Sequence, residues 1–204
     1  MGDTPTFSAL RRLLTRAASP ATAPCCELCG APLPGEHSHV ADTGTRRLLC
    51  VCAGCAPRST LNAAMQAVSS RYVHGRGMQM SAEQWADLEI PVDLAFIFYN
   101  AALDRFVVSY PGPAGAVESL IPLERWQSLS EAHPWARTLH ADVEAVLARR
   151  AGDGYQCFVV PIDRCYELVG RVRSAWSGFD GGDAVRLEVD RFFADLAARC
   201  GAAA

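Results

Sequence analysis

The sequence predicts an α+β protein: a small Cys-rich module resembling a zinc ribbon or treble clef, then a mainly antiparallel sheet packed by three to four helices. Two Cys-x-x-Cys corners, several short apolar runs separated by turn residues, and two apolar stripes at helical spacing indicate this architecture. We expect an N-terminal helix and linker at 1–24, a metal-binding module with a connecting helix at 25–80, and the α+β body at 81–200.

Composition narrows the class of protein. Half of the 204 residues are hydrophobic, which is enough to bury a core, and every one of the 19 basic residues is arginine. Residues 1–80 carry eight Arg against four acids, a net charge of +4 that four thiolates and one divalent ion would reduce to +2. So small an excess argues against a nucleic-acid partner. No apolar run approaches the roughly 20 residues of a membrane span, so we expect a cytoplasmic protein.

Four cysteines form two corners, Cys26-x-x-Cys29 and Cys52-x-x-Cys55, with 22 residues between them. In each corner the two-residue gap lets both sulfur atoms face one ion, and this spacing is typical of tetrahedral four-thiolate sites. A reducing cytoplasm also favours metal binding over disulfides. We expect zinc in a structural role. The alternative is an iron–sulfur cluster, because Cys50, Cys52 and Cys55 lie close together in sequence.

Three further residues are candidates for additional or exchangeable ligation. His37 and His39 alternate on one face of a predicted strand, and Cys50 precedes the second corner. Alternation also describes two solvated or second-shell histidines. If all three bind metal together with the four corner cysteines, the module has too many donors for one tetrahedral ion, and a second metal or a transient delivery site follows.

The elements of the first 80 residues follow from local signals. Apolar residues at helical spacing predict an amphipathic helix before the linker SPATAP. The segments HSHVAD and RRLLCV predict a hairpin that turns at Thr43–Gly44. Ser59 and Thr60 can cap a helix over Leu61–Ser69, and the glycine-bearing stretch 70–81 reads as an irregular connection.

The body begins with a predicted meander. VDLAFIFYN, DRFVVSYP and VESLIPL read as strands, and helices are expected at Leu123–Leu129 and Pro134–Arg150. YQCFVVPI is a fourth strand, after which Asp163 can cap a helix with an apolar stripe. Gly178–Gly182 breaks the chain before a final amphipathic helix.

Catalysis is not indicated. The chain has no phosphate-binding glycine loop, HExxH helix or GxSxG elbow. Carboxylates such as Asp93 and Asp163 lie at element ends, where turns and helix caps explain them. Cys157 and Cys165 fall on a predicted strand and an apolar helix stripe, so we expect buried side chains.

Two families share features with the chain. CELCG, the histidines and the second corner resemble the zinc frame of HNH nucleases, but Asp42 follows the histidines instead of preceding them, and no histidine follows Asn62 until His74. The nuclease active residues are therefore missing.

The second resemblance covers most of residues 25–197. CELCGAPLPGEHSHVADTGTRRLLCVCAGC, PVDLAFIFYNAALDRFVVSYPGPAGAVESLIPLERW and VPIDRCYELVGRVRSAWSGFDGG are similar to an uncharacterised actinobacterial family encoded beside high-affinity nickel–iron hydrogenases. The family pattern includes His37, His39 and Cys50 as well as the corner cysteines. The resemblance implies a cytoplasmic accessory protein whose partner is a hydrogenase subunit or maturation factor.

The leading hypothesis is thus a non-catalytic metal-binding accessory protein for hydrogenase assembly. A nucleic-acid-binding or regulatory zinc ribbon is the first alternative, with Arg46, Arg47, Arg58, Arg71 and Arg76 as phosphate contacts. An iron–sulfur electron-transfer or cluster-delivery protein is the second.

Overall fold

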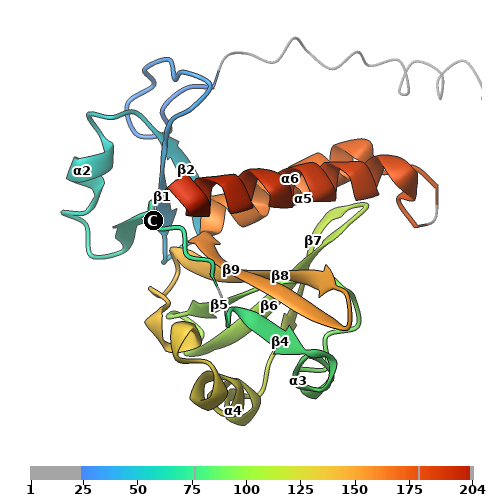
Figure 1. The fold of residues 1–204 in the computed structure, drawn as a ribbon. Coiled ribbons are helices and arrows are strands. Elements are labelled where there is room, and N and C mark those ends of the chain that lie inside the picture. The colour runs from blue at the N-terminus through green and yellow to red at the C-terminus, as the bar shows by residue number, and fades with distance from the viewer. Residues whose placement is uncertain (1–23, 76, 179, 203–204) are drawn as a thin grey trace, which may run out of the picture.

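The computed structural model describes residues 24–75, 77–178 and 180–202, and its chain forms two antiparallel sheets with helices around the larger one (Figure 1). The predicted α+β class, with a small cysteine-rich unit ahead of a larger sheet, is confirmed. The amphipathic helix expected before the linker lies outside the described residues.

The smaller sheet has the strand order β2-β1-β3 and carries the cysteines. Strand β1 (Ser38–Asp42) pairs with β2 (Arg47–Val51) in the hairpin that the sequence predicts. The turn is held by the Asp42 side chain, whose Oδ1 accepts hydrogen bonds from the backbone N–H groups of Gly44 and Thr45 at 3.0 and 3.1 Å. Register along the hairpin places His39 directly opposite Cys50.

The helix expected over Leu61–Ser69 is wrong. Helix α2 covers only Ala56–Ser59, and the chain then turns into β3 (Met65–Ala67), which pairs with the second edge of β1. The Ser59 hydroxyl donates backwards to the carbonyl of Ala56, so it does not cap a following helix. Leu61, the first residue of the expected helix, is 87% exposed. Pairing with β1 prevails over local helix propensity.

The larger sheet has six antiparallel strands in the order β4-β9-β8-β5-β6-β7. Three of them form the predicted meander, and β9 is the predicted fourth strand. The bounds are β4 Gln79–Ser81, β5 Leu94–Asn100, β6 Arg105–Gly112, β7 Gly115–Leu120, β8 Glu144–Ala151 and β9 Gly154–Pro161. Strand β4 closes one edge by pairing with β9 within a stretch that sequence patterning reads as irregular.

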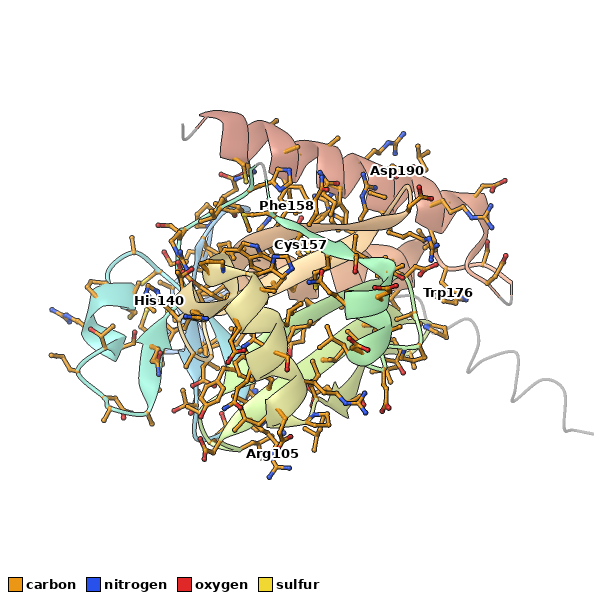
Figure 2. All side chains as sticks on the ribbon, turned by 60° about the horizontal axis from the view of Figure 1, so that its bottom comes forward. Arg105, His140, Cys157, Phe158, Trp176 and Asp190 are labelled. Carbon is orange, nitrogen blue, oxygen red and sulfur yellow. The ribbon has the colours of Figure 1, made fainter. Side chains whose placement is uncertain are left out.

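Helices cover both faces of this sheet, which makes the body three layers thick (Figure 1). Helices α3 (Ala82–Asp87) and α4 (Leu123–Ala132) lie on one face, and α5 (Ile162–Ala175) and α6 (Gly182–Ala202) lie on the other. Successive strand residues point to opposite faces, so neighbours such as Cys157 and Phe158, labelled in Figure 2, join different cores. Burial on both faces explains the continuous apolar runs of β5 and β9.

The helix expected over Pro134–Arg150 is also wrong. Only a short 3₁₀ helix, η1 (Pro134–Thr138), occupies its start, and residues from Glu144 onward form β8 in the middle of the sheet. Ala, Leu, Glu and Arg favour helix in isolation. Here Val143 and residues Glu144–Ala148 are all buried, because β8 has strands on both sides and helices above and below. Tertiary burial decides the conformation of this segment.

The two C-terminal helices match their predicted stripes. Cys165, Leu168 and Val172 of α5 are buried, as are Phe192, Phe193 and Leu196 of α6. Asp163 does not cap α5 as expected, since Pro161 occupies that position and Asp163 lies in the first turn. Within the described residues, no helix combines the length and apolarity that crossing a membrane requires.

An ion pair between the partly exposed Arg71 and the buried Glu144 fixes the connection between the two sheets. The side chain of Glu144, at the start of β8, is fully buried and accepts hydrogen bonds from Arg71 Nε at 2.9 Å and Ser69 Oγ at 2.7 Å. Burial alone would raise the pKa of Glu144, but these hydrogen bonds outweigh it and lower the pKa to about 2. Arg71 also donates to the carbonyl of Thr138, so one guanidinium joins the connection to η1 and β8.

We expect Arg71→Met to lower the free energy of unfolding by roughly 2 to 3 kcal/mol, because it leaves a buried carboxylate without its cation while water still reaches the vacated side. Arg186→Met is the matched control: Arg186 pairs with Asp183 on the surface, and its loss should cost less than about 1 kcal/mol. Urea unfolding followed by tryptophan fluorescence measures both. Equal losses in the two variants would contradict a structural role for the Arg71–Glu144 pair.

Candidate metal centre

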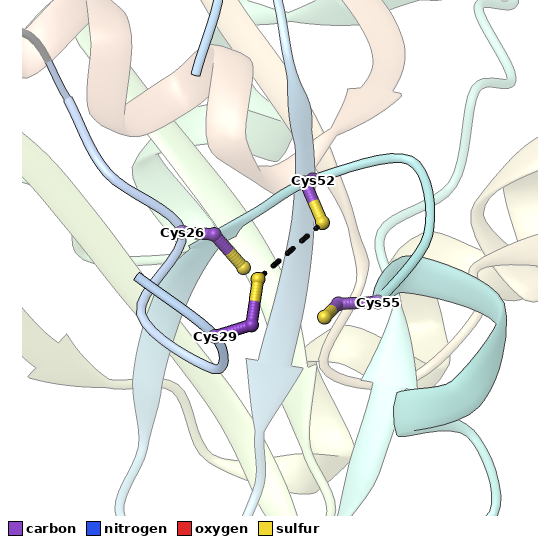
Figure 3. Close-up of side chains that lie close together, drawn as sticks. All are labelled: Cys26, Cys29, Cys52 and Cys55. Carbon is purple, nitrogen blue, oxygen red and sulfur yellow. Dashed lines mark hydrogen bonds between the residues drawn. The ribbon is translucent and has the colours of Figure 1, made fainter. Parts of the chain in front are cut away.

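The thiols of Cys26, Cys29, Cys52 and Cys55 converge at one end of the smaller sheet (Figure 3). All four Sγ atoms lie within 4.8 Å of one another, and Cys29 and Cys52 are 3.8 Å apart. A tetrahedral ion with metal–sulfur bonds of about 2.3 Å requires sulfur–sulfur edges of roughly 3.8 Å. The donor set and its spacing therefore suit one tetrahedral metal ion such as zinc.

The first corner is a tight turn closed by backbone hydrogen bonds at both ends. The Gly30 N–H donates to the carbonyl of Cys26 at 2.8 Å, and the Cys26 N–H donates to the carbonyl of Ala31 at 2.7 Å. Gly30 has a φ of +74°, the left-handed conformation that glycine adopts without steric cost. This turn directs the side chains of Cys26 and Cys29 toward the same point.

The second corner runs directly into a helix. The N–H groups of Cys55 and Ala56 both donate to the carbonyl of Cys52 at 3.0 Å, and Cys55 is the N-cap residue of α2. Between the corners, the Glu27 carboxylate accepts from the backbone N–H of Cys50 at 2.7 Å and from Arg47 at 3.1 Å. Glu27 thus binds the first corner to the strand that leads into the second.

Proton affinity differs sharply among these thiols. The backbone N–H of Cys52 lowers the pKa of Cys26 to about 6, although partial desolvation opposes it. Interactions with the thiols of Cys29 and Cys52 raise the pKa of Cys55 to about 12. Neighbouring sulfur atoms resist sharing several negative charges, and a divalent cation between them relieves that repulsion.

A second group of donors lies beside the first. His37, His39 and Cys50 place one donor atom each within 4.8 Å of the others, and the two imidazole rings are 4.7 Å apart between centroids. Cross-strand pairing of His39 with Cys50 accounts for their proximity. The structure therefore separates the seven sequence-predicted donors into a cluster of four cysteines and a cluster of two histidines and one cysteine.

The remaining cysteines lie apart from these clusters or beside them. Cys157 and Cys165 are fully buried as expected, and burial raises the pKa of Cys157 to about 12. Cys25 is exposed and forms an isolated bridge with Pro32. Such positions favour a packing role for Cys157 and Cys165.

One residue of this region was missed as a site residue. Asp163, at the start of α5, accepts a hydrogen bond from His39 Nδ1 at 2.9 Å across 124 residues of sequence. Its position suggested a helix cap, and no local pattern could reveal a partner in a separate sheet. The pairing of a histidine with a carboxylate so distant in sequence can be seen only in the folded chain.

Replacing Gly30 with alanine should destabilise the first corner by about 1 kcal/mol, because a Cβ disfavours the left-handed conformation. Gly35→Ala is the matched control, since neither glycine has an atom near the position of a new Cβ and only Gly30 has a positive φ. Hydrogen exchange of β1 amides reports the difference. Equal exchange in both variants would contradict the assignment of conformational cost to Gly30.

Comparison with known proteins places the chain in a family. No curated protein matches the sequence, and no solved structure matches the fold. Residues 25–200 match a family of unknown function, DUF5947, and this match extends from the cysteine clusters into the last turn of α6. Since the match covers most of the sequence, the chain belongs to the DUF5947 family of unknown function.

Proposed function

We propose that this protein is a non-catalytic metal-binding accessory protein that assists assembly or maturation of a nickel–iron hydrogenase in the cytoplasm. Metal binding is supported by the convergence of four thiols from two corners that backbone hydrogen bonds hold in place. The hydrogenase part is supported by the sequence resemblance described above. The partner would be a hydrogenase subunit or another maturation factor.

Zinc is the metal that we assign to the four-cysteine cluster, with Cys26, Cys29, Cys52 and Cys55 as its ligands. Closed four-thiolate sites usually hold small modules together instead of carrying out chemistry. The module needs such support, because its apolar cluster fully buries few side chains of the described chain, namely Cys26, Leu33, Val40, Leu49 and Val51. Binding energy of the ion would then contribute directly to folding of the module.

The alternative functions find less support. Arg46, Arg47 and Arg71 each pair with a carboxylate, namely Glu118, Glu27 and Glu144, which reduces the positive charge available to a nucleic acid. Arg76 lies outside the described residues. Cys50 groups with His37 and His39 and not with the corner thiols, which disfavours an iron–sulfur cluster built on Cys50, Cys52 and Cys55.

Anaerobically purified protein, treated with a chelator that removes weakly held metal, should retain about one zinc per chain and show no visible absorbance. Cys29→Ser should lose this zinc and open residues 25–58 while leaving the helices of the body folded, because those helices pack on the two cores of the larger sheet. Elemental analysis and circular dichroism measure the two effects.

Cys25→Ser provides the matched control, since Cys25 neighbours Cys26 but lies outside the cluster. It should keep its zinc. If the wild-type protein contains iron and sulfide, the metal is an iron–sulfur cluster and the zinc assignment is wrong. If Cys29→Ser keeps the wild-type metal content, Cys29 is not a ligand and the ligand assignment is overturned.

A host strain without this protein should lose most of its nickel–iron hydrogenase activity, with less nickel in the large hydrogenase subunit. The wild-type protein and Cys25→Ser should restore both, whereas Cys29→Ser should not, because its module does not fold. Normal hydrogenase activity and nickel content in the deletion strain would refute the hydrogenase assignment without affecting the zinc assignment.

A further inference from the structure

The cluster of His37, His39 and Cys50 has a feature that a chance group of polar side chains lacks: both imidazoles are held by their Nδ1 atoms. His37 Nδ1 lies 3.0 Å from the carbonyl oxygen of Pro34, and His39 Nδ1 lies 2.9 Å from Asp163 Oδ2. Both partners only accept hydrogen bonds when the carboxylate is ionised, so both Nδ1 atoms must donate. In the neutral rings, each Nε2 then carries a lone pair.

For His37, the lone pair of Nε2 lies where the protein gives it no hydrogen-bond donor. Its Nε2 is buried from solvent and has no hydrogen-bond partner among the described residues. A buried polar atom without a partner costs free energy unless something else satisfies it. The His37 ring lies 4.7 Å from the His39 ring between centroids, and one ring nitrogen of each histidine lies within 4.8 Å of the other and of the Cys50 Sγ atom.

Metal-ligating histidines have this arrangement. They commonly donate the second ring N–H to a backbone carbonyl or a carboxylate, which fixes the tautomer and orients the ring. Pro34 and Asp163 would serve as these outer partners for His37 and His39. The cluster thus has both its donor atoms and the support that a metal site requires.

We propose that His37 Nε2, His39 Nε2 and Cys50 Sγ form a second, exchangeable site for a divalent transition-metal ion, distinct from the four-cysteine cluster. Two imidazoles and one thiolate suit ions of borderline softness, such as Zn²⁺ or Co²⁺, and not Mg²⁺ or Ca²⁺, which take oxygen ligands. Binding displaces the thiol proton of Cys50. Three protein donors leave the fourth position of a tetrahedral ion to water or to a donor from another protein.

The surroundings of the cluster favour exchange of the ion. A hollow of about 400 Å³ adjoins both clusters, and its walls are formed by Pro34, Glu36, His37, Ser38, Cys52 and Ala53. An ion or a donor group from a partner protein could approach His37 through this hollow. The proposal does not rest on the function proposed above, because none of its three donors belongs to the four-cysteine cluster.

Cobalt titration of the full-length protein, first loaded with one equivalent of Zn²⁺, tests this site. The wild-type protein should bind one further equivalent of Co²⁺ with tetrahedral d–d bands and the charge-transfer absorption of a single thiolate. Cys50→Ser should abolish that charge-transfer absorption, and His37→Ala and His39→Ala should each prevent binding of the second equivalent. Each variant should keep its zinc.

Asp163→Asn gives a readout that does not remove a ligand. It should weaken Co²⁺ binding roughly 10- to 100-fold, as loss of an outer carboxylate partner does at other sites. His140→Gln is the matched control. The Nδ1 atom of His140, which is labelled in Figure 2, also lies beside a carboxylate, 3.3 Å from Glu144 Oε1, but His140 does not belong to the cluster. It should bind Co²⁺ like the wild-type protein.

Two results would overturn the second site. The wild-type protein could fail to bind metal beyond the first equivalent, or the Cys50, His37 and His39 variants could all retain the second equivalent with unchanged spectra. Circular dichroism confirms that each variant is folded. Absence of tightly held zinc in the wild-type protein would instead refute the four-cysteine site, so the two assignments fail separately.

Discussion

Among the residues that the structure describes, five buried side chains, one of them a metal-ligand candidate, form the centre of the core around the cysteine-rich sheet. Burial in so small a core offsets little of the free-energy cost of the conformational entropy lost on folding. Modules of this size therefore usually need a covalent or metal cross-link that acts as a staple. A metal ion held by four thiols supplies one. The backbone hydrogen bonds of both corners, the left-handed Gly30 and the Glu27 carboxylate position the sulfur atoms that such a staple requires.

The second constraint on the module is its contact with the body. Arg71 and Glu144 hold the connecting segment, while His39 and Asp163 join β1 to α5. Arg46 also reaches Glu118 on β7. Polar contacts that water reaches contribute little to the free energy of association of two packed units. Their main effect is to fix the orientation of one unit relative to the other. The proposed second site is built across this junction, since its outer carboxylate belongs to the body.

The two clusters would have different roles, one structural and one in metal exchange. Four thiolates make a closed site, in which the ion has no position for another ligand. The proposed site of two histidines and one thiolate lies beside a hollow, and a partner protein would complete or empty it. An accessory protein in metalloenzyme assembly would use the first to fold and the second to exchange metal.

The sequence alone determined the features set by local spacing: the two cysteine corners, the hairpin with His39 and Cys50, the meander, and the apolar stripes of α5 and α6. Only the tertiary structure decided the conformation of residues 61–69 and 134–150. Their local preference is helical, but parts of these segments pair in β3 and β8. Strand pairing is non-local, so no window of neighbouring residues encodes it. For the same reason, only the folded chain separated the donors into two clusters and joined Asp163 to His39.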